Sequence, residues 1–144
     1  MYEDILVPTD GSDGASAALD EAIDLAAAFD ATVHSLYVVD INAASTESGA
    51  LDLVESFEQR GESVVDAATE RADEAGVDAV GSVVTGKPYR DIIDYADEHG
   101  IDLVVMGTHG RTGLERYLLG SVTEKVVRTA DVPVLTVRAP EDDA

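Results

Sequence analysis

Residues 107–121 read GTHGRTGLERYLLGS and follow directly on the apolar run DLVVM. Three glycines fall within the first seven residues of this stretch, and a fourth, Gly120, stands beside Ser121. Glycine accepts positive φ and lets other groups approach the backbone closely. A glycine-rich loop after a buried strand, with Gly-Ser where a helix can begin, predicts a cradle of main-chain N–H groups for an anion.

The simpler interpretation of this loop is a flexible connection followed by a helix cap. Two features favour a ligand instead. The start of the next helix offers free N–H donors and the positive end of the helix dipole, and Ser121 and Thr123 can add hydroxyl donors. Four of the nine Lys and Arg residues lie between residues 111 and 128 of an otherwise acidic chain. This local positive charge fits an anionic ligand.

Working outward, strand-like apolar runs alternate with segments of helical spacing. Strands are predicted over residues 3–8, 31–40, 78–86, 101–107 and 132–138, and helices over residues 13–30, 50–75, 87–100 and 120–131. The strands are nearly continuous apolar runs, as expected when both faces of a sheet are covered. The fold class is therefore α/β: a single domain with a doubly wound, five-stranded parallel sheet of order 3-2-1-4-5 and helices on both faces.

In a doubly wound sheet, ligands bind beyond the carboxyl ends of the strands, where the strand order reverses. The loops after the first and fourth strands flank this point. The first-strand loop reads PTDGSD, and Asp10, Ser12 or Asp13 can cap the helix that follows. Residues 41–50 are small and polar, and they either close over a ligand or stay loose.

Composition sets broad limits on the protein. The 144 residues fit one domain, and the absence of cysteine excludes disulfides and thiolate metal sites. No apolar run approaches the roughly 20 residues that span a bilayer. The N-terminal residues MYEDILVPTD carry acidic rather than basic side chains, which is unlike a signal peptide. We expect a cytoplasmic protein.

Net charge is the unusual feature of the composition. Thirty Asp and Glu residues against nine Lys and Arg give a formal charge of −21. Such a chain should be repelled by nucleic acid and by anionic membranes. Its 45% hydrophobic content argues against disorder. The acidic residues follow helix patterns, which suggests a folded protein with an acidic surface adapted to high salt, as in a halophile.

Other motifs carry less weight. Residues 81–88, GSVVTGKP, match a P-loop spacing but have Pro88 where magnesium binding needs Ser or Thr. His109 either donates to a phosphate oxygen or braces the loop. No two histidines are spaced as a metal pair, so a divalent ion would arrive with a nucleotide. No nucleophile elbow or catalytic triad is present, and no residue is assigned a catalytic role.

The pattern G-x2-G-x9-G-[ST], formed by Gly107, Gly110, Gly120 and Ser121, resembles the ATP-binding branch of the universal stress protein family. The resemblance covers nearly the whole chain, including ILVPTDGSDGASAAL, LYVVD and VVTGKPYRDIIDYA. It implies a Rossmann-like, adenine nucleotide alpha hydrolase-like fold. It also implies a nucleotide-binding domain over residues 1–138, followed by an acidic tail over residues 139–144.

The resemblance further implies which residues bind the nucleotide. Three residues of the first loop would lie along the adenosine, with the third near the ribose or a metal: Pro8, Thr9 and Asp10. The backbone of Val38 would meet the adenine edge. The loop after the fourth strand would hold ribose and phosphate: Gly107, Thr108, His109, Gly110, Arg111, Thr112 and Gly113. The start of the last helix would hold the phosphates: Gly120, Ser121, Val122 and Thr123.

By resemblance, the ligand is ATP, AMP or ADP, with Mg²⁺ carried by the nucleotide. Universal stress proteins commonly dimerise through the last strand, so a homodimer with a regulatory role and an unknown protein partner is expected. The alternative is a slow ATPase or an ATP-dependent transferase on the same scaffold. His-x-Gly-His and Ser-Gly-Gly-x-Asp-Ser loops, typical of related transfer enzymes, do not occur. A scaffold that has lost its ligand is a weaker third possibility.

Overall fold

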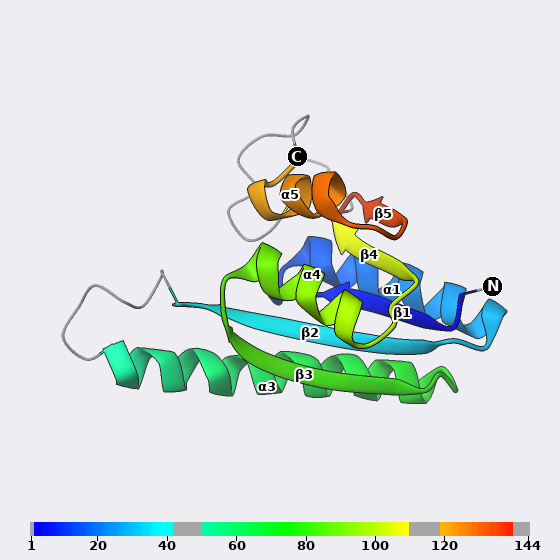
Figure 1. The fold of residues 1–144 in the computed structure, drawn as a ribbon. Helices are drawn as coiled ribbons and strands as arrows, with labels where there is room; N and C mark the ends of the chain where they lie inside the picture. Colours follow the sequence, from blue (N-terminus) through cyan, green and yellow to red (C-terminus); the bar gives the residue numbers. More distant parts are fainter. Residues whose placement is uncertain (1, 42–49, 110–118, 140–144) are drawn as a thin grey trace, which may run out of the picture.

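A computed structural model describes residues 2–41, 50–109 and 119–139. Strands and helices alternate along the chain (Figure 1). The strands are β1 (Asp4–Pro8), β2 (Thr32–Asp40), β3 (Ala79–Gly86), β4 (Leu103–Gly107) and β5 (Val134–Val137). The helices with described bounds are α1 (Asp13–Phe29), α3 (Ala50–Glu74), α4 (Pro88–Glu98) and α5 (Ser121–Thr129).

The strands form one parallel sheet in the order β3-β2-β1-β4-β5. This confirms the predicted fold class and strand order. The chain first adds strands on one side of β1 and then crosses to its other side at β4, so the order reverses between β1 and β4. The loops after these two strands therefore meet at one edge of the sheet, where the sequence predicts the ligand.

Two apolar layers cover the two faces of the sheet. Ile5 and Val7 of β1 point to the face that α1 and α3 cover, whereas Leu6 points to the face that α4 and α5 cover. This alternation is the period-two geometry of a strand buried on both sides. Figure 1 shows α4 in front of the sheet and α1 behind it. The central strand β1 thus has no face in contact with solvent. Only its carboxyl end reaches the edge of the sheet where the ligand is predicted.

The first helix shows how local sequence sets an element. Ser12 is the N-cap, and its side chain accepts a hydrogen bond from the N–H of Ala15. Alanines along one face bury that face against the sheet, and the helix ends at Asp30 in a left-handed conformation. Phe29, although at helical spacing, is 41% exposed and packs edge-on against Tyr2.

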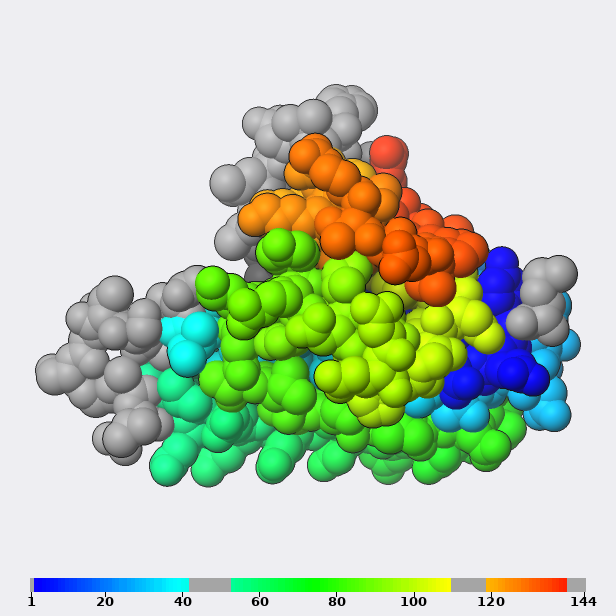
Figure 2. All heavy atoms as spheres, viewed as in Figure 1, coloured from blue at the N-terminus to red at the C-terminus, as the bar shows by residue number. Residues whose placement is uncertain are grey.

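On the opposite face, α4 and α5 pack against each other. The ammonium of Lys125 in α5 lies 5.3 Å from the centre of the Tyr89 ring in α4. Figure 2 shows the two helices, in green and orange, forming one continuous surface. Within the described ranges, no helix is both long enough and apolar enough to cross a membrane.

Candidate functional site

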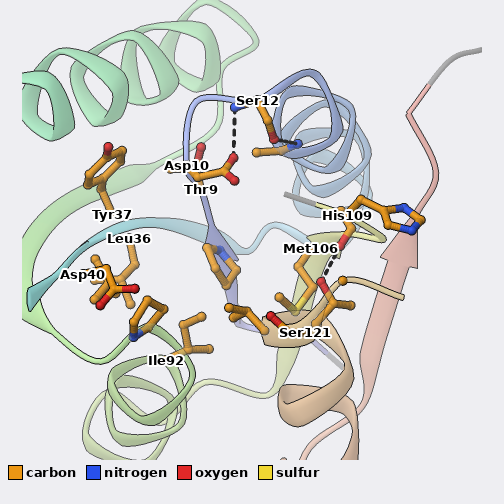
Figure 3. Close-up of a pocket in the computed structure, with 18 of the residues that line it drawn as sticks. Thr9, Asp10, Ser12, Leu36, Tyr37, Asp40, Ile92, Met106, His109 and Ser121 are labelled. Atoms are coloured by element: carbon orange, nitrogen blue, oxygen red, sulfur yellow. Dashed lines mark hydrogen bonds between the residues drawn. The ribbon is translucent and has the colours of Figure 1, made fainter. Parts of the chain in front are cut away.

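A cleft of about 470 Å³ opens at the carboxyl ends of β1, β2 and β4 (Figure 3). This volume is in the usual range of small-molecule sites. Ten of the residues that the sequence singles out line it together: Pro8, Thr9, Asp10, Val38, Gly107, His109, Gly120, Ser121, Val122 and Thr123. Gly110, Arg111, Thr112 and Gly113 lie outside the described residues.

One half of the cleft is an apolar slot. Leu36 of β2, Ile92 of α4 and Met106 of β4 are all buried residues of the core on the α4 side, and each reaches the cleft wall. Val38 packs against the same side of the core, and Phe57 of α3 lines the cleft from the other face of the sheet. A flat apolar group such as an aromatic ring fits between such walls, because it buries its faces without leaving polar atoms unpaired.

The other half is the N-terminus of α5. Its N-cap is Gly120, which has no side chain to bond the helix amides. The first helical hydrogen bond runs from the N–H of Glu124 to the carbonyl of Gly120. The N–H groups of Ser121, Val122 and Thr123 precede it and have no partner within the helix. Because all three residues line the cleft, this end of the helix presents main-chain donors and a positive dipole to it.

Three hydrogen bonds fix this helix end relative to the sheet. The N–H of Gly120 donates to the carbonyl of Thr108 at 2.7 Å, and the N–H of Thr108 donates to Val137 at 3.0 Å. The hydroxyl of Thr123, which is buried, donates to the carbonyl of Gly107 at 2.8 Å. The structure therefore corrects two expectations. The Gly120 N–H and the Thr123 hydroxyl hydrogen are engaged within the protein rather than free for a ligand.

The start of α1 packs tightly against the end of β4. A Cβ added to Gly107 would lie 2.9 Å from the carbonyl carbon of Gly14, and one added to Gly14 would lie 2.9 Å from the carbonyl oxygen of His109. Both approaches are shorter than real Cβ contacts, so these two positions require glycine. The sequence predicts the role of Gly107 in the loop, but it does not reveal the partner Gly14.

The loop after β1 is held by its own side chains. The carboxylate of Asp10 accepts a hydrogen bond from the N–H of Ser12 at 2.9 Å, and the hydroxyl of Thr9 accepts one from Gly11 at 3.1 Å. Gly11 has φ of +80°, which favours glycine. These bonds direct Thr9 and Asp10 to the cleft wall opposite α5.

His109 lies in the loop that leaves β4. Its Nδ1 is 3.1 Å from the hydroxyl of Thr108, and its Nε2 is buried without a hydrogen-bond partner among the described residues. In Figure 3 the imidazole points away from Leu36 and Met106. This orientation favours the bracing role over direct donation to a ligand.

Charge in the described part of the cleft differs from expectation. Lys125 lies over Tyr89, and exposed Arg128 pairs with Glu124 one turn earlier, so neither lines the cleft. The charged carboxylates on the wall are Asp10 and Asp40. Among the described lining residues, attraction for an anion therefore comes from main-chain amides and the helix dipole, rather than from basic side chains.

Several lining residues were not predicted from the sequence. They come from α1 and its N-cap, from both faces of β2, and from α3, α4 and β4: Ser12, Ala15, Leu36, Tyr37, Val39, Asp40, Phe57, Pro88, Ile92 and Met106. Alternation along β2 could have placed Leu36 beside Val38, because residues two apart share a face. Phe57 and Ile92 carry no such signal, since their place depends on how α3 and α4 pack. In the described ranges, no group of three His, Asp or Glu residues could hold a metal ion.

The universal stress protein family model matches residues 1–138. The chain belongs to this family. A universal stress protein of Methanocaldococcus jannaschii is 39% identical over 146 aligned positions, which cover 99% of this chain and 86% of that protein.

Solved universal stress protein structures agree with this fold. One from Lactobacillus plantarum is 32% identical with a TM-score of 0.87, and the match covers 95% of this chain and 98% of that one. A universal stress protein in complex with cAMP is 30% identical with a TM-score of 0.72, covering 96% and 98%. The five-stranded parallel arrangement is thus that of known universal stress proteins.

Proposed function

We propose that this universal stress protein binds an adenine nucleotide, ATP in the first place and AMP or ADP in addition. The observation that carries the proposal is the set of three main-chain amides at the start of α5 that open onto the 470 Å³ cleft. These amides suit a phosphate group because their N–H donors and the positive end of the helix dipole both face the cleft. The apolar slot beside Val38 suits the base, and the cAMP complex of a 30% identical relative supports a nucleotide.

In this proposal the residues divide by chemistry. Ser121, Val122 and Thr123 hold phosphate oxygens through their main-chain N–H groups. Asp10 lies on the wall opposite these amides, in reach of the sugar or of a magnesium ion carried by the nucleotide. Residues 107–113 complete the phosphate loop, although 110–113 fall outside the described part of the chain. The domain over residues 1–138 and the acidic tail over 139–144 stay part of this proposal.

We propose a regulatory rather than a catalytic role. The sequence contains no nucleophile elbow and no loop typical of related transfer enzymes, so we expect hydrolysis slower than about one turnover per second. Nucleotide occupancy would then act through a homodimer on a protein partner. The alternative of an ATP-dependent transferase on the same scaffold predicts turnover above that rate, whereas a slow ATPase would hydrolyse ATP at a measurable rate below it.

Mass spectrometry of nucleotide released from denatured protein, together with calorimetric titration of ATP, tests the proposal. Gly120→Val should weaken ATP binding by at least about tenfold, because the side chain crowds the amides that hold phosphate. Ser121→Ala is the matched control: it keeps the amides and should cost less than about fivefold. A folded protein that releases no nucleotide and ignores added ATP would contradict the proposal.

A further inference from the structure

A second cavity, of about 200 Å³, lies between α1 and α3 over β1 and β2. One water molecule needs only about 10–15 Å³ of cavity volume, so the cavity has room for a small organic molecule. Its lining residues come from four elements and the first loop: Val7, Thr9, Gly11, Ser12, Ala15, Ser16, Leu19, Ser35, Val64, Ala67, Ala68 and Arg71. The proposed nucleotide function does not use this cavity.

The floor of the cavity holds an unpaired hydroxyl. Ser35 is only 2% exposed, and its Oγ has no hydrogen-bond partner in the described part of the chain. Its side chain lies on the same face of β2 as Val33 and Tyr37, which pack toward α1 and α3. A buried hydroxyl without a partner is destabilising, because it has lost its hydrogen bonds to water. A polar atom bound in the cavity would remove this cost.

The rim of the cavity carries a basic side chain. Arg71 of α3 donates to the hydroxyl of Ser16 at 3.1 Å and pairs with Asp20, which is itself exposed. A guanidinium has five N–H donors, more than these two contacts use. Arg60 lies nearby, with its guanidinium 3.9 Å from where a Cβ on Gly11 would be. Two of the nine cations thus lie close to this opening in a chain of charge −21.

Much of the wall between floor and rim is apolar, and Thr9, Ser12 and Ser16 add hydroxyl groups to it. Val7 and Leu19 belong to the core between the sheet and α1, and Val64 and Ala68 continue the wall along α3. A ligand that fits must therefore have a polar atom for the floor, a short apolar body and an anionic group for the rim.

We propose that this cavity binds a short-chain hydroxy-carboxylate. Its carboxylate would lie against Arg71, and its hydroxyl would bond Ser35. Arginine binds carboxylates with directed, charge-assisted hydrogen bonds, which offsets the unfavourable overall charge of the protein. The competing occupant is water alone, and the test separates the two.

The cavity shares a wall with the nucleotide cleft. Thr9, Ser12 and Ala15 line both. An acid bound on one side of this loop would change the affinity of the cleft for a nucleotide on the other side. By reciprocity, a bound nucleotide would change the affinity for the acid by the same factor. This coupling rests on the proposed nucleotide function, whereas binding of the acid does not.

Direct binding is tested by titrating ¹⁵N-labelled protein with sodium lactate at constant ionic strength. We expect saturable shifts of the Ser35, Ser16 and Arg71 amide signals, with a dissociation constant on the order of 1–10 mM. Propionate, which lacks the hydroxyl, should bind about three- to tenfold more weakly. Absence of saturable shifts with lactate would mean that the cavity holds water only and would overturn the proposal.

Substitutions test which residue binds the hydroxyl and which binds the carboxylate. Ser35→Ala should make lactate and propionate bind equally, and Arg71→Gln should weaken both by about tenfold or more. Exposed residues provide matched controls: Ser63→Ala in α3 and Arg90→Gln in α4 should leave both affinities unchanged. Lactate binding that survives Ser35→Ala and Arg71→Gln unaltered would contradict the placement.

The coupling has its own readout. The ATP dissociation constant, measured with and without saturating lactate, should differ by about fivefold, and Arg71→Gln should abolish the difference. An unchanged ATP affinity with normal lactate binding would overturn the coupling alone. A protein that binds lactate but not ATP would contradict the proposed function while leaving the acid site standing.

Discussion

At the scale of single residues, the contact between Gly107 and Gly14 packs the start of α1 against the end of β4 beside the cleft. A side chain at Gly107 has no space, because the backbone of Gly14 would lie 2.9–3.2 Å from its Cβ. We predict that Gly107→Ala lowers the free energy of unfolding by about 1–3 kcal/mol, as overpacking does elsewhere. Urea denaturation followed by circular dichroism measures the change.

Gly86→Ala is the matched control for this substitution. Gly86 also ends a strand, but the three atoms nearest to its added Cβ all belong to the carboxylate of Asp91, the far end of a flexible side chain. The carboxylate can rotate away, so the cost should stay below about 1 kcal/mol. Equal destabilisation by both substitutions would show that the backbone contact with Gly14 is not the cause.

A buried polar chain lies at the other end of the sheet. His34 Nε2 is 2.9 Å from the Asp4 carboxylate, and its Nδ1 is 2.8 Å from the Tyr95 hydroxyl. Tyr95 stacks on His99 with 3.8 Å between ring centres. Burial raises the pKa of Tyr95 above its ordinary value of 10.0, and a hydrogen bond with Ser82 partly opposes this shift.

The raised pKa of Tyr95 predicts a loss of stability at high pH. The folded protein keeps the phenol neutral, whereas the unfolded chain ionises it near pH 10.0, so the contribution is complete below pH 10.0 and declines as pH rises through the folded-state pKa. The difference in unfolding free energy between the natural protein and Tyr95→Phe should therefore shrink above pH 10.0. A difference that is constant from pH 8 to about 11 would contradict this assignment.

At the scale of elements, the two helix starts at the cleft differ in how they are capped. The side chain of Ser12 caps α1 through Ala15, but the N-cap of α5 is Gly120, which leaves its amides to the cleft. A side chain of the protein thus satisfies one of the first amides of α1, whereas no side chain caps α5.

Ser12→Ala should cost about 1 kcal/mol of unfolding free energy, because the N–H of Ala15 loses its acceptor. Ser63→Ala, at an exposed position within α3, should change stability by less than about 0.5 kcal/mol. Chemical denaturation of both variants measures the contrast. If Ser12→Ala were no more harmful than Ser63→Ala, the cap would have no energetic role.

At the scale of the whole molecule, both edges of the sheet expose apolar side chains. Leu135 on β5 is 38% exposed, and Val80 on β3 is 46% exposed. The proposed homodimer pairs β5 with its copy, which would cover one edge only. Leu135→Lys should therefore convert the dimer to a monomer in analytical ultracentrifugation.

Val80→Lys provides the matched control at the opposite edge and should leave the dimer intact. The two substitutions add the same charge to a similarly exposed strand position, so general repulsion cannot explain a difference between them. Dissociation by Val80→Lys but not by Leu135→Lys would place the interface at β3 instead.

The net charge of −21 should make stability depend on salt. Self-repulsion of surface carboxylates weakens as added ions screen it, so we predict that the melting temperature rises between about 0.1 and 2 M KCl. Sucrose at matched osmolarity stabilises without screening and should give a smaller rise. A melting temperature that is independent of KCl would contradict adaptation to high salt.

The sequence by itself determined the order of elements, the parallel sheet and the two loops at the ligand edge. These features depend on local hydrophobic patterns, such as the apolar run DLVVMG of a buried strand, and on the rules that govern how successive elements connect. The family resemblance added Val38, and the structure places it in the same cleft as Gly120. Local signals were sufficient here because each concerns neighbouring residues on one strand or loop.

Only the tertiary structure decided which polar groups keep a free hydrogen-bonding position. The Gly120 N–H and the Thr123 hydroxyl donate within the protein, whereas the Ser35 hydroxyl, which faces a second cavity, finds no partner among the residues that the structure describes. These outcomes depend on contacts between residues far apart in the chain. No periodicity encodes them, because they follow from how helices pack on the sheet rather than from where each helix begins.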